Sequence, residues 1–168
     1  MKEKGHLPLL GVGPVIIAVQ VLITVIGAIV SYRGYFAAGK IEWLNIPLKI
    51  GGIGLMVFGF FLNYSAKRKS KLFEMVAENK QITTGVYSIV RNPVYSAVLL
   101  ACTGAVCISN NLILFFIPVI CWIYMTVFLK LTEEKWLTDL YGQEYIEYCK
   151  KVNRCIPWFP KKNLSSSN

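Results

Sequence analysis

The chain has 168 residues, a formal net charge of +9, and a mean hydropathy of +0.51. Apolar residues make up 55% of it and charged residues only 16%, whereas a soluble domain carries about 25% charged residues. The apolar residues gather in long blocks, which argues against a soluble globule, and the same composition excludes a disordered chain. We therefore expect one all-α, multi-pass transmembrane domain over residues 1–168.

The numbers and spacing of cysteine and histidine limit which kinds of site the chain can form. The five cysteines show no CxxC spacing, and His6 is the only histidine. A disulfide framework, a zinc site and a histidine general base all lack parts, so we expect no metal. A basic chain can bind nucleic acid, but beside long apolar blocks its charge favours a membrane surface as the partner.

Four apolar stretches predict the membrane spans: residues 9–30, 46–64, 93–109 and 112–131. The first is uncharged and would reach about 33 Å as a helix, enough to cross a hydrocarbon core of about 30 Å. It is too long for a signal peptide, so we interpret it as an uncleaved transmembrane helix. Only Asn110 and Asn111 separate the last two stretches, which predicts an antiparallel helical hairpin with a tight turn.

The distribution of Lys and Arg predicts the orientation of the chain in the membrane. Most of the 18 Lys and Arg residues lie before the first span, in the loop 65–91, or in the tail from Lys130 onwards. These segments share one side of the membrane, and the positive-inside rule makes that side cytoplasmic. We expect both termini and the active site on this side, in an integral membrane protein of a prokaryotic plasma membrane.

The residues that could bind a ligand or take part in a reaction precede the third span and follow the fourth. Asn92 and Pro93 suit the N-cap and first position of a helix, whose free N–H groups attract an anion. Tyr87 and Tyr95 flank this helix start and suit a cation, and Glu133 suits an ammonium group or ribose hydroxyls. A capped helix with interfacial tyrosines and a solvated acidic turn explains the same residues without a ligand.

Several motifs together carry a resemblance. They are Gly85-Val86-Tyr87, Arg91-Asn92-Pro93-x-Tyr95, Glu133-Glu134, and Tyr141-Gly142-x-Glu144-Tyr145-x-x-Tyr148 followed by Ile156-Pro157. In this order they resemble the isoprenylcysteine carboxyl methyltransferase family, which is related to the membrane phospholipid methyltransferases. The resemblance covers residues 79–160. It implies S-adenosyl-L-methionine at the cytoplasmic end of the last hairpin, with contacts from Asn79, Lys80, Gln81, Ile82, Tyr87, Asn92, Pro93, Val94, Tyr95 and Glu133.

The chain departs from the family pattern at two positions. Arg-Asn-Pro replaces the usual Arg-His-Pro, and Leu129 stands where eukaryotic members carry an arginine that serves the substrate. These departures leave the cofactor better defined than the methyl acceptor. A carboxylate acceptor needs placement and no general base, because it is already ionised at neutral pH. Arg91, Lys130 and Arg154 are candidates for steering such a carboxylate.

The sequence thus favours an S-adenosylmethionine-dependent membrane methyltransferase acting on the carboxylate of a lipophilic, isoprenylcysteine-like substrate. The first alternative is an N- or O-methyltransferase of a phospholipid or another small lipophile. The second is a non-enzymatic membrane scaffold or transporter whose loop motifs only cap helices.

Three further features have structural interpretations. The glycines between positions 51 and 59 indicate close helix packing, and residues 136–152 predict an amphipathic tail broken near Gly142. The run Lys67-Arg68-Lys69 is typical of a topology signal that contacts anionic lipid.

Overall fold

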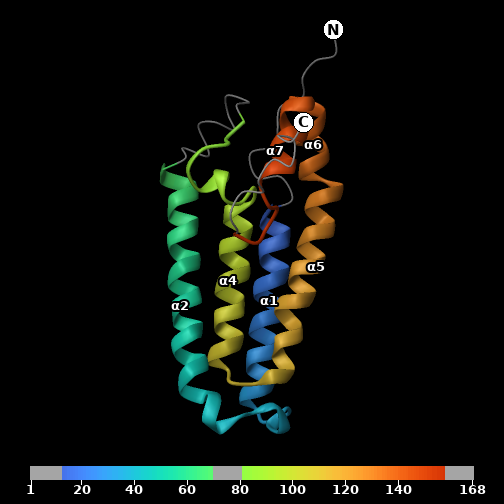
Figure 1. Ribbon diagram of the computed structural model, residues 1–168. Coiled ribbons are helices and arrows are strands. Elements are labelled where there is room, and N and C mark those ends of the chain that lie inside the picture. Colours follow the sequence, from blue (N-terminus) through green and yellow to red (C-terminus); the bar gives the residue numbers. More distant parts are fainter. Residues whose placement is uncertain (1–12, 70–80, 158–168) are drawn as a thin grey trace, which may run out of the picture.

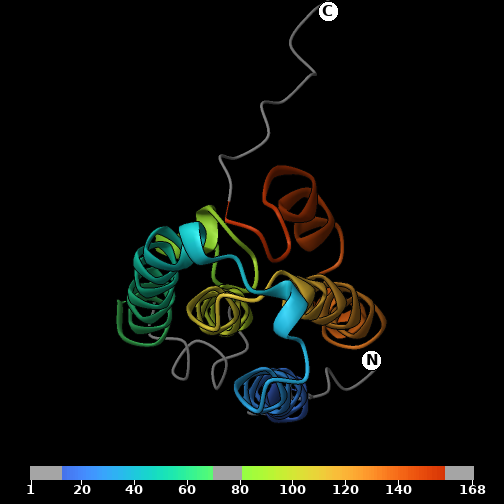
Figure 2. The same ribbon diagram turned by 90° about the horizontal axis from the view of Figure 1, so that it is seen from below.

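The computed structural model describes residues 13–69 and 81–157. Its long helices are α1 (Gly13–Tyr32), α2 (Asn45–Tyr64), α4 (Pro93–Ile108) and α5 (Phe116–Leu131). They run up and down in one bundle, and α4 lies in its middle, with α2 on one side and α1 and α5 on the other (Figure 1, Figure 2). The predicted all-α class is confirmed, and each predicted apolar stretch forms a helix close to its expected bounds.

The helices differ in their ability to cross a bilayer. The helical segments Gly13–Tyr32, Glu42–Arg68 and Leu112–Tyr141 are long and apolar enough to span it. The 16 residues of α4 rise about 24 Å, less than the hydrocarbon thickness of about 30 Å. The bundle therefore surrounds a short central helix with three longer helical segments, and the outer apolar side chains of these segments are exposed, as expected of a surface that faces lipid.

Glycines bring α2 and α4 into close contact. A Cβ atom on Gly52 would lie 2.6 Å from the carbonyl oxygen of Gly104, and one on Gly59 would lie 2.7 Å from that of Ala97. Any larger residue would push the two backbones apart. The predicted packing role is confirmed at these two positions, whereas Gly51 and Gly54 face open space.

The turn between α4 and α5 is tied to the loop between α1 and α2. Asn110 adopts the left-handed conformation with φ 46°, which an asparagine tolerates in a tight turn. The buried amide of Asn111 donates to the Ser31 hydroxyl and to the Phe36 carbonyl, each at 2.9 Å. The predicted hairpin is confirmed, and its tight turn closes this end of the bundle.

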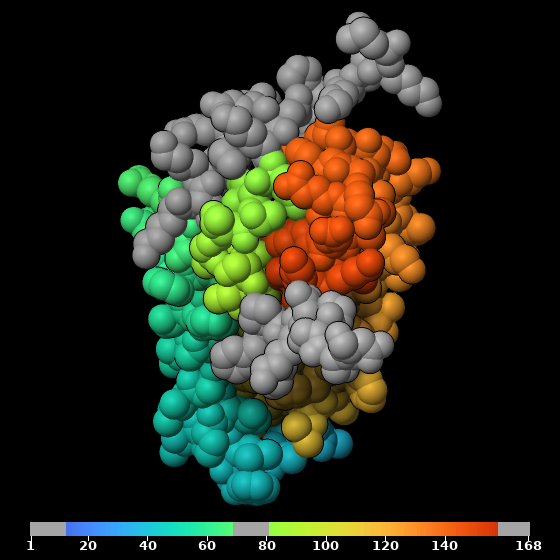
Figure 3. Space-filling view, turned by 45° about the horizontal axis from the view of Figure 1, so that its top comes forward, coloured from blue at the N-terminus to red at the C-terminus, as the bar shows by residue number. Residues whose placement is uncertain are grey.

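The opposite end carries a helical cap. It consists of α6 (Glu133–Tyr141) and α7 (Gln143–Lys151), separated by Gly142 at φ 59°. A strap of residues 152–157 then returns to the start of α4, where the amide of Arg91 donates to the Asn153 carbonyl at 2.8 Å. Figure 3 shows the loop before α4 lying directly against this cap. The predicted break near Gly142 is confirmed.

Candidate active site

The start of α4 presents unused backbone donors. Asn92 and Pro93 occupy the expected N-cap and first helical positions, but the Asn92 side chain makes no capping hydrogen bond. Its amide donates instead to the Arg154 carbonyl at 3.1 Å, so the expected side-chain cap is wrong. The strap places that carbonyl beside the helix start, where it accepts the hydrogen bond from the side-chain amide nitrogen. The N–H groups of Val94 and Tyr95 therefore lie in the first turn without an intrahelical acceptor.

Tyr95 and Glu133 meet at this end of the bundle. The Tyr95 hydroxyl, on the first turn of α4, donates a hydrogen bond to the carboxylate of Glu133, the first residue of α6. Gly13, at the start of α1, closes the third side, because a Cβ atom there would lie 2.6 Å from the Tyr95 hydroxyl oxygen. Three segments distant in sequence thus converge on one pair of side chains.

Tyr87 completes an aromatic and acidic group around this pair. It lies in the short helix η4 (Gly85–Ser88) and is only 8% exposed. The Tyr148 hydroxyl of α7 donates to the Tyr87 carbonyl, which holds the cap over the loop. Burial raises the pKa of the Tyr87 hydroxyl above its ordinary value, with smaller contributions from Tyr148 and from the negative charge of Glu133.

Glu134 makes a separate, buried ion cluster with two arginines. It accepts hydrogen bonds from Arg154 at 2.6 and 2.8 Å, and its carboxylate lies 3.2 Å from a terminal nitrogen of Arg91. Arg91 also donates to the thiol sulfur of Cys149 on α7. The cluster connects the loop before α4, the start of α6, α7 and the strap.

The candidates for substrate steering are thus placed differently from one another. The structure brings Arg91 and Arg154 together, but around a carboxylate of the chain itself. Lys130 is exposed on the last turn of α5, away from that cluster. Sequence reasoning assigned no role to Glu134, and its only signal was its place beside Glu133 in a first helical turn.

The cofactor contacts implied by the resemblance are brought together in part. Tyr87, Glu133 and residues 92–95 gather at the capped end of the bundle. Gln81 and Ile82 are half-buried in the loop before η4, and Asn79 and Lys80 lie outside the described residues. Both polar atoms of the Gln81 side chain are buried without a partner in the described part of the chain. Such an amide suits a polar ligand, because a buried donor or acceptor left unpaired destabilises the protein.

The donor set fits S-adenosylmethionine better than a metal. It combines backbone N–H groups for a carboxylate, a carboxylate for an ammonium group or ribose hydroxyls, and tyrosine rings for a sulfonium. Across residues 13–69 and 81–157, no three His, Cys, Asp or Glu side chains come together as metal ligands would.

Known proteins place these features in a family. The family profile described as phospholipid methyltransferase matches residues 48–144. The chain is 31% identical to protein-S-isoprenylcysteine O-methyltransferase B of Arabidopsis thaliana over 81 residues, which cover 48% of this chain and 41% of that protein. It is 26% identical to protein-S-isoprenylcysteine O-methyltransferase of Schizosaccharomyces pombe over 133 residues, 74% of this chain and 56% of that protein.

A bacterial relative is named for a different methyl acceptor. The chain is 36% identical over 73 residues to methanethiol S-methyltransferase 1 of Bradyrhizobium diazoefficiens, covering 44% of this chain and 25% of that protein. The chain spans about half the length, or less, of these relatives. No solved structure matches it significantly. The profile match covers more than half of the chain and confirms the resemblance predicted from the motifs: the chain belongs to the phospholipid methyltransferase family.

Proposed function

We propose that this protein is a membrane methyltransferase that binds S-adenosylmethionine at the capped end of the bundle and methylates a lipophilic acceptor carrying a carboxylate. The observation that carries the proposal is the hydrogen bond between Tyr95 and Glu133, because it joins the helix start and the acidic residue expected to share the cofactor. The family membership supports the reaction class.

Each wall of the site has a distinct role in this proposal. The N–H groups of Val94 and Tyr95 hold the carboxylate of the cofactor, which the positive end of the helix dipole also attracts. Glu133 binds the ammonium group or the ribose hydroxyls. The faces of Tyr87 and Tyr95 lie against the sulfonium. When bound, S-adenosylmethionine supplies a methyl group on that positively charged sulfur.

The chain's part in the reaction is placement and exclusion of water. A carboxylate, with an ordinary pKa of about 3.3–3.7, is ionised at neutral pH and attacks without losing a proton. Bound S-adenosylmethionine would supply the methyl group by in-line displacement, in which the new oxygen–carbon bond would form as the carbon–sulfur bond breaks and its electrons return to sulfur. Holding the two reactants in this line and desolvating the carboxylate supply the rate enhancement.

The short central helix favours an acceptor that arrives from the bilayer. Figure 1 shows the π-helical turn that follows α2 (Ser65–Lys69) reaching farther out than the start of α4. A lipophilic substrate could therefore present its polar end at the site while its apolar part stays in the hydrocarbon region. The basic residues near this end place it on the cytoplasmic side in our proposal, together with both termini.

A second candidate is methylation of a phospholipid amine, which the description of the family favours. One experiment separates the two acceptors. Membranes containing the full chain would be incubated with a donor carrying a labelled methyl group and then treated with base. Carboxyl methylation predicts release of labelled methanol, whereas amine methylation leaves label in base-stable lipid. Absence of transfer, together with absence of donor binding at micromolar concentration, would instead support a non-enzymatic scaffold or transporter.

A further inference from the structure

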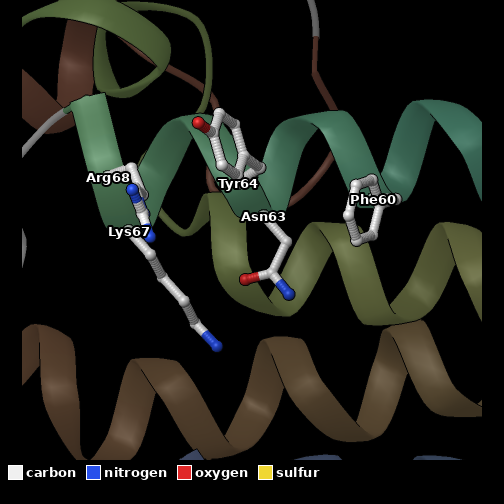
Figure 4. A pocket seen from close by; sticks show the side chains of 5 residues that line it. All are labelled: Phe60, Asn63, Tyr64, Lys67 and Arg68. Atoms are coloured by element: carbon white, nitrogen blue, oxygen red, sulfur yellow. The ribbon is translucent and has the colours of Figure 1, made fainter.

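A second candidate binding feature lies at the end of α2, outside the candidate active site. A hollow of about 290 Å³ is lined by Phe60, Asn63, Tyr64, Lys67 and Arg68 (Figure 4). The last turns of α2 and the π-helical turn η3 (Ser65–Lys69) form it. None of its lining residues belongs to the groups around Glu133 and Glu134, so its role does not rest on the proposed methyl transfer.

The order of side chains along α2 matches the layers of a bilayer. Phe60 and Tyr64 are 72% and 47% exposed within the spanning segment Glu42–Arg68. Lys67 and Arg68 follow at its very end and are also exposed. In membrane proteins, Tyr and Trp rings are enriched at the level of the glycerol and head groups, and Lys and Arg side chains extend to the level of the lipid phosphates. The hollow therefore offers apolar contact on its inner side and positive charge on its outer side.

The side-chain oxygen of Asn63 needs a hydrogen-bond donor, which a phosphate group alone does not provide. This oxygen is buried and has no hydrogen-bond donor among the described residues. Figure 4 shows the Asn63 and Lys67 side chains extending from the same side of α2. A buried acceptor without a donor is costly, and a ligand hydroxyl next to a phosphate would remove that cost. The ligand thus needs a negative charge and a hydrogen-bond donor close together.

We infer that this hollow binds the head group of an anionic glycerophospholipid whose phosphate carries a hydroxyl-bearing substituent, as in phosphatidylglycerol. Lys67 and Arg68 hold the phosphate, Asn63 accepts a hydrogen bond from the head-group hydroxyl, and Phe60 and Tyr64 contact the glycerol and upper acyl chain. The site is a lipid-binding site separate from the methyl-transfer site.

The test uses the full chain in detergent, with thermal unfolding followed as lipid is titrated. The probes are phosphatidylglycerol, phosphatidic acid, phosphatidylcholine and inorganic phosphate. Phosphatidylglycerol should stabilise the protein at the lowest concentration, because phosphatidic acid lacks the hydroxyl and phosphatidylcholine lacks both the hydroxyl and the net charge. The variant K67Q/R68Q should lower the apparent affinity for phosphatidylglycerol about tenfold or more, since each cation near an anionic lipid contributes substantially.

Two further variants make the test specific. K40Q/K49Q removes the same charge from exposed lysines before and within the first turns of α2, at its opposite end, and should leave the affinity within about twofold. Asn63→Leu keeps the branching of the side chain but removes the acceptor, so it should abolish the preference for phosphatidylglycerol over phosphatidic acid. Equal losses in K67Q/R68Q and K40Q/K49Q, equal stabilisation by phosphatidylcholine, or stabilisation by inorganic phosphate in place of the lipid would each overturn the inference.

Discussion

The hydroxyl of Tyr95 donates a hydrogen bond to the carboxylate of Glu133, across a separation of 38 residues in sequence. The neighbouring Glu134 faces two arginines instead. Successive residues at the start of a helix point in different directions, so one acidic pair contributes both to the candidate site and to the neighbouring ion cluster. This division of roles makes the two glutamates separable by mutation.

The coupling between Tyr95 and Glu133 can be measured directly. Tyr95→Phe and Glu133→Gln should each weaken binding of S-adenosylmethionine about tenfold, because each removes one partner of a charge-assisted hydrogen bond. The double variant should lose little more than either single variant, with a coupling free energy of about 1–2 kcal/mol. Calorimetry in detergent measures all four affinities. Strictly additive losses would show that the hydrogen bond does not organise the cofactor site.

Gly13 is predicted to set the position of the Tyr95 hydroxyl. In Gly13→Ala the new methyl group would lie 2.6 Å from the hydroxyl oxygen, so the tyrosine must move away and its bond to Glu133 must weaken. We expect donor affinity to fall severalfold with little change in thermal stability. Gly51→Ala is the matched control, because a Cβ atom there meets nothing within 4 Å. Unchanged affinity in Gly13→Ala would mean that α1 takes no part in the site.

Sequence patterning predicted the bundle because its signals are local. Apolar length located the helices, Asn110 and Asn111 allowed only a tight turn, and Gly142 marked the break in the cap. The meeting of Tyr95 with Glu133 also followed from topology, since a hairpin returns its two outer ends to one face. These features depend on chain length and backbone conformation, which the residue order determines closely.

Long-range polar contacts were not predictable in the same way. Asn92 has the sequence signature of a side-chain cap, yet its amide donates to the Arg154 carbonyl. That carbonyl arrives by the strap, whose path no local pattern encodes. The sequence likewise made Arg91 and Arg154 candidates for steering a substrate, whereas in the structure both interact with the carboxylate of Glu134. A charged residue's partner depends on tertiary packing, so only coordinates distinguish a steering arginine from a structural one.

Glu134 should matter mainly for stability and only indirectly for the cofactor. Glu134→Leu would leave two arginines, one of them with a side chain only 8% exposed, facing each other without a counter-charge. Loss of one partner from such a cluster destabilises a protein by about 3–5 kcal/mol, so the thermal midpoint in detergent should fall sharply. The double variant Glu134→Leu with Arg154→Met should recover part of that loss, because it removes the excess charge. A double variant less stable than Glu134→Leu would contradict the assigned pairing.

The backbone at Gly142 predicts a specific loss in the cap. With φ 59° and ψ −130°, the residue occupies a region that alanine rarely adopts, although a Cβ atom there would meet no neighbour within 4 Å. Gly142→Ala should therefore cost about 1–3 kcal/mol through backbone strain alone. Faster amide hydrogen exchange in α7 of this variant would reveal the loss of stability. Gly54→Ala, also in open space but inside α2, should have no such effect, and equal exchange in both variants would exclude a strained link.

The buried hydroxyls and thiols of the cap predict instability at alkaline pH. Burial raises the pKa of the Tyr145 and Tyr148 hydroxyls above the ordinary 10.0 and that of the Cys149 thiol above 9.0, and it raises the pKa of Cys155 to about 12. At a pH between a group's pKa in the unfolded chain and its higher pKa in the folded chain, the unfolded chain has already released a proton that the folded chain retains. Stability is therefore complete below about pH 9 and falls as pH rises, by up to about 1.4 kcal/mol per pH unit for each group.

Thermal midpoints measured from pH 7.5 to 10.5 in detergent would test this alkaline dependence. Tyr145→Phe removes one buried titrating hydroxyl from α7, so its midpoint should decline less steeply with pH than that of the parent chain. Gly54→Ala leaves every titrating group in place and should keep the parent slope. A parent midpoint that is flat across this range, or one that rises, would contradict the burial of these groups in α7 and the strap.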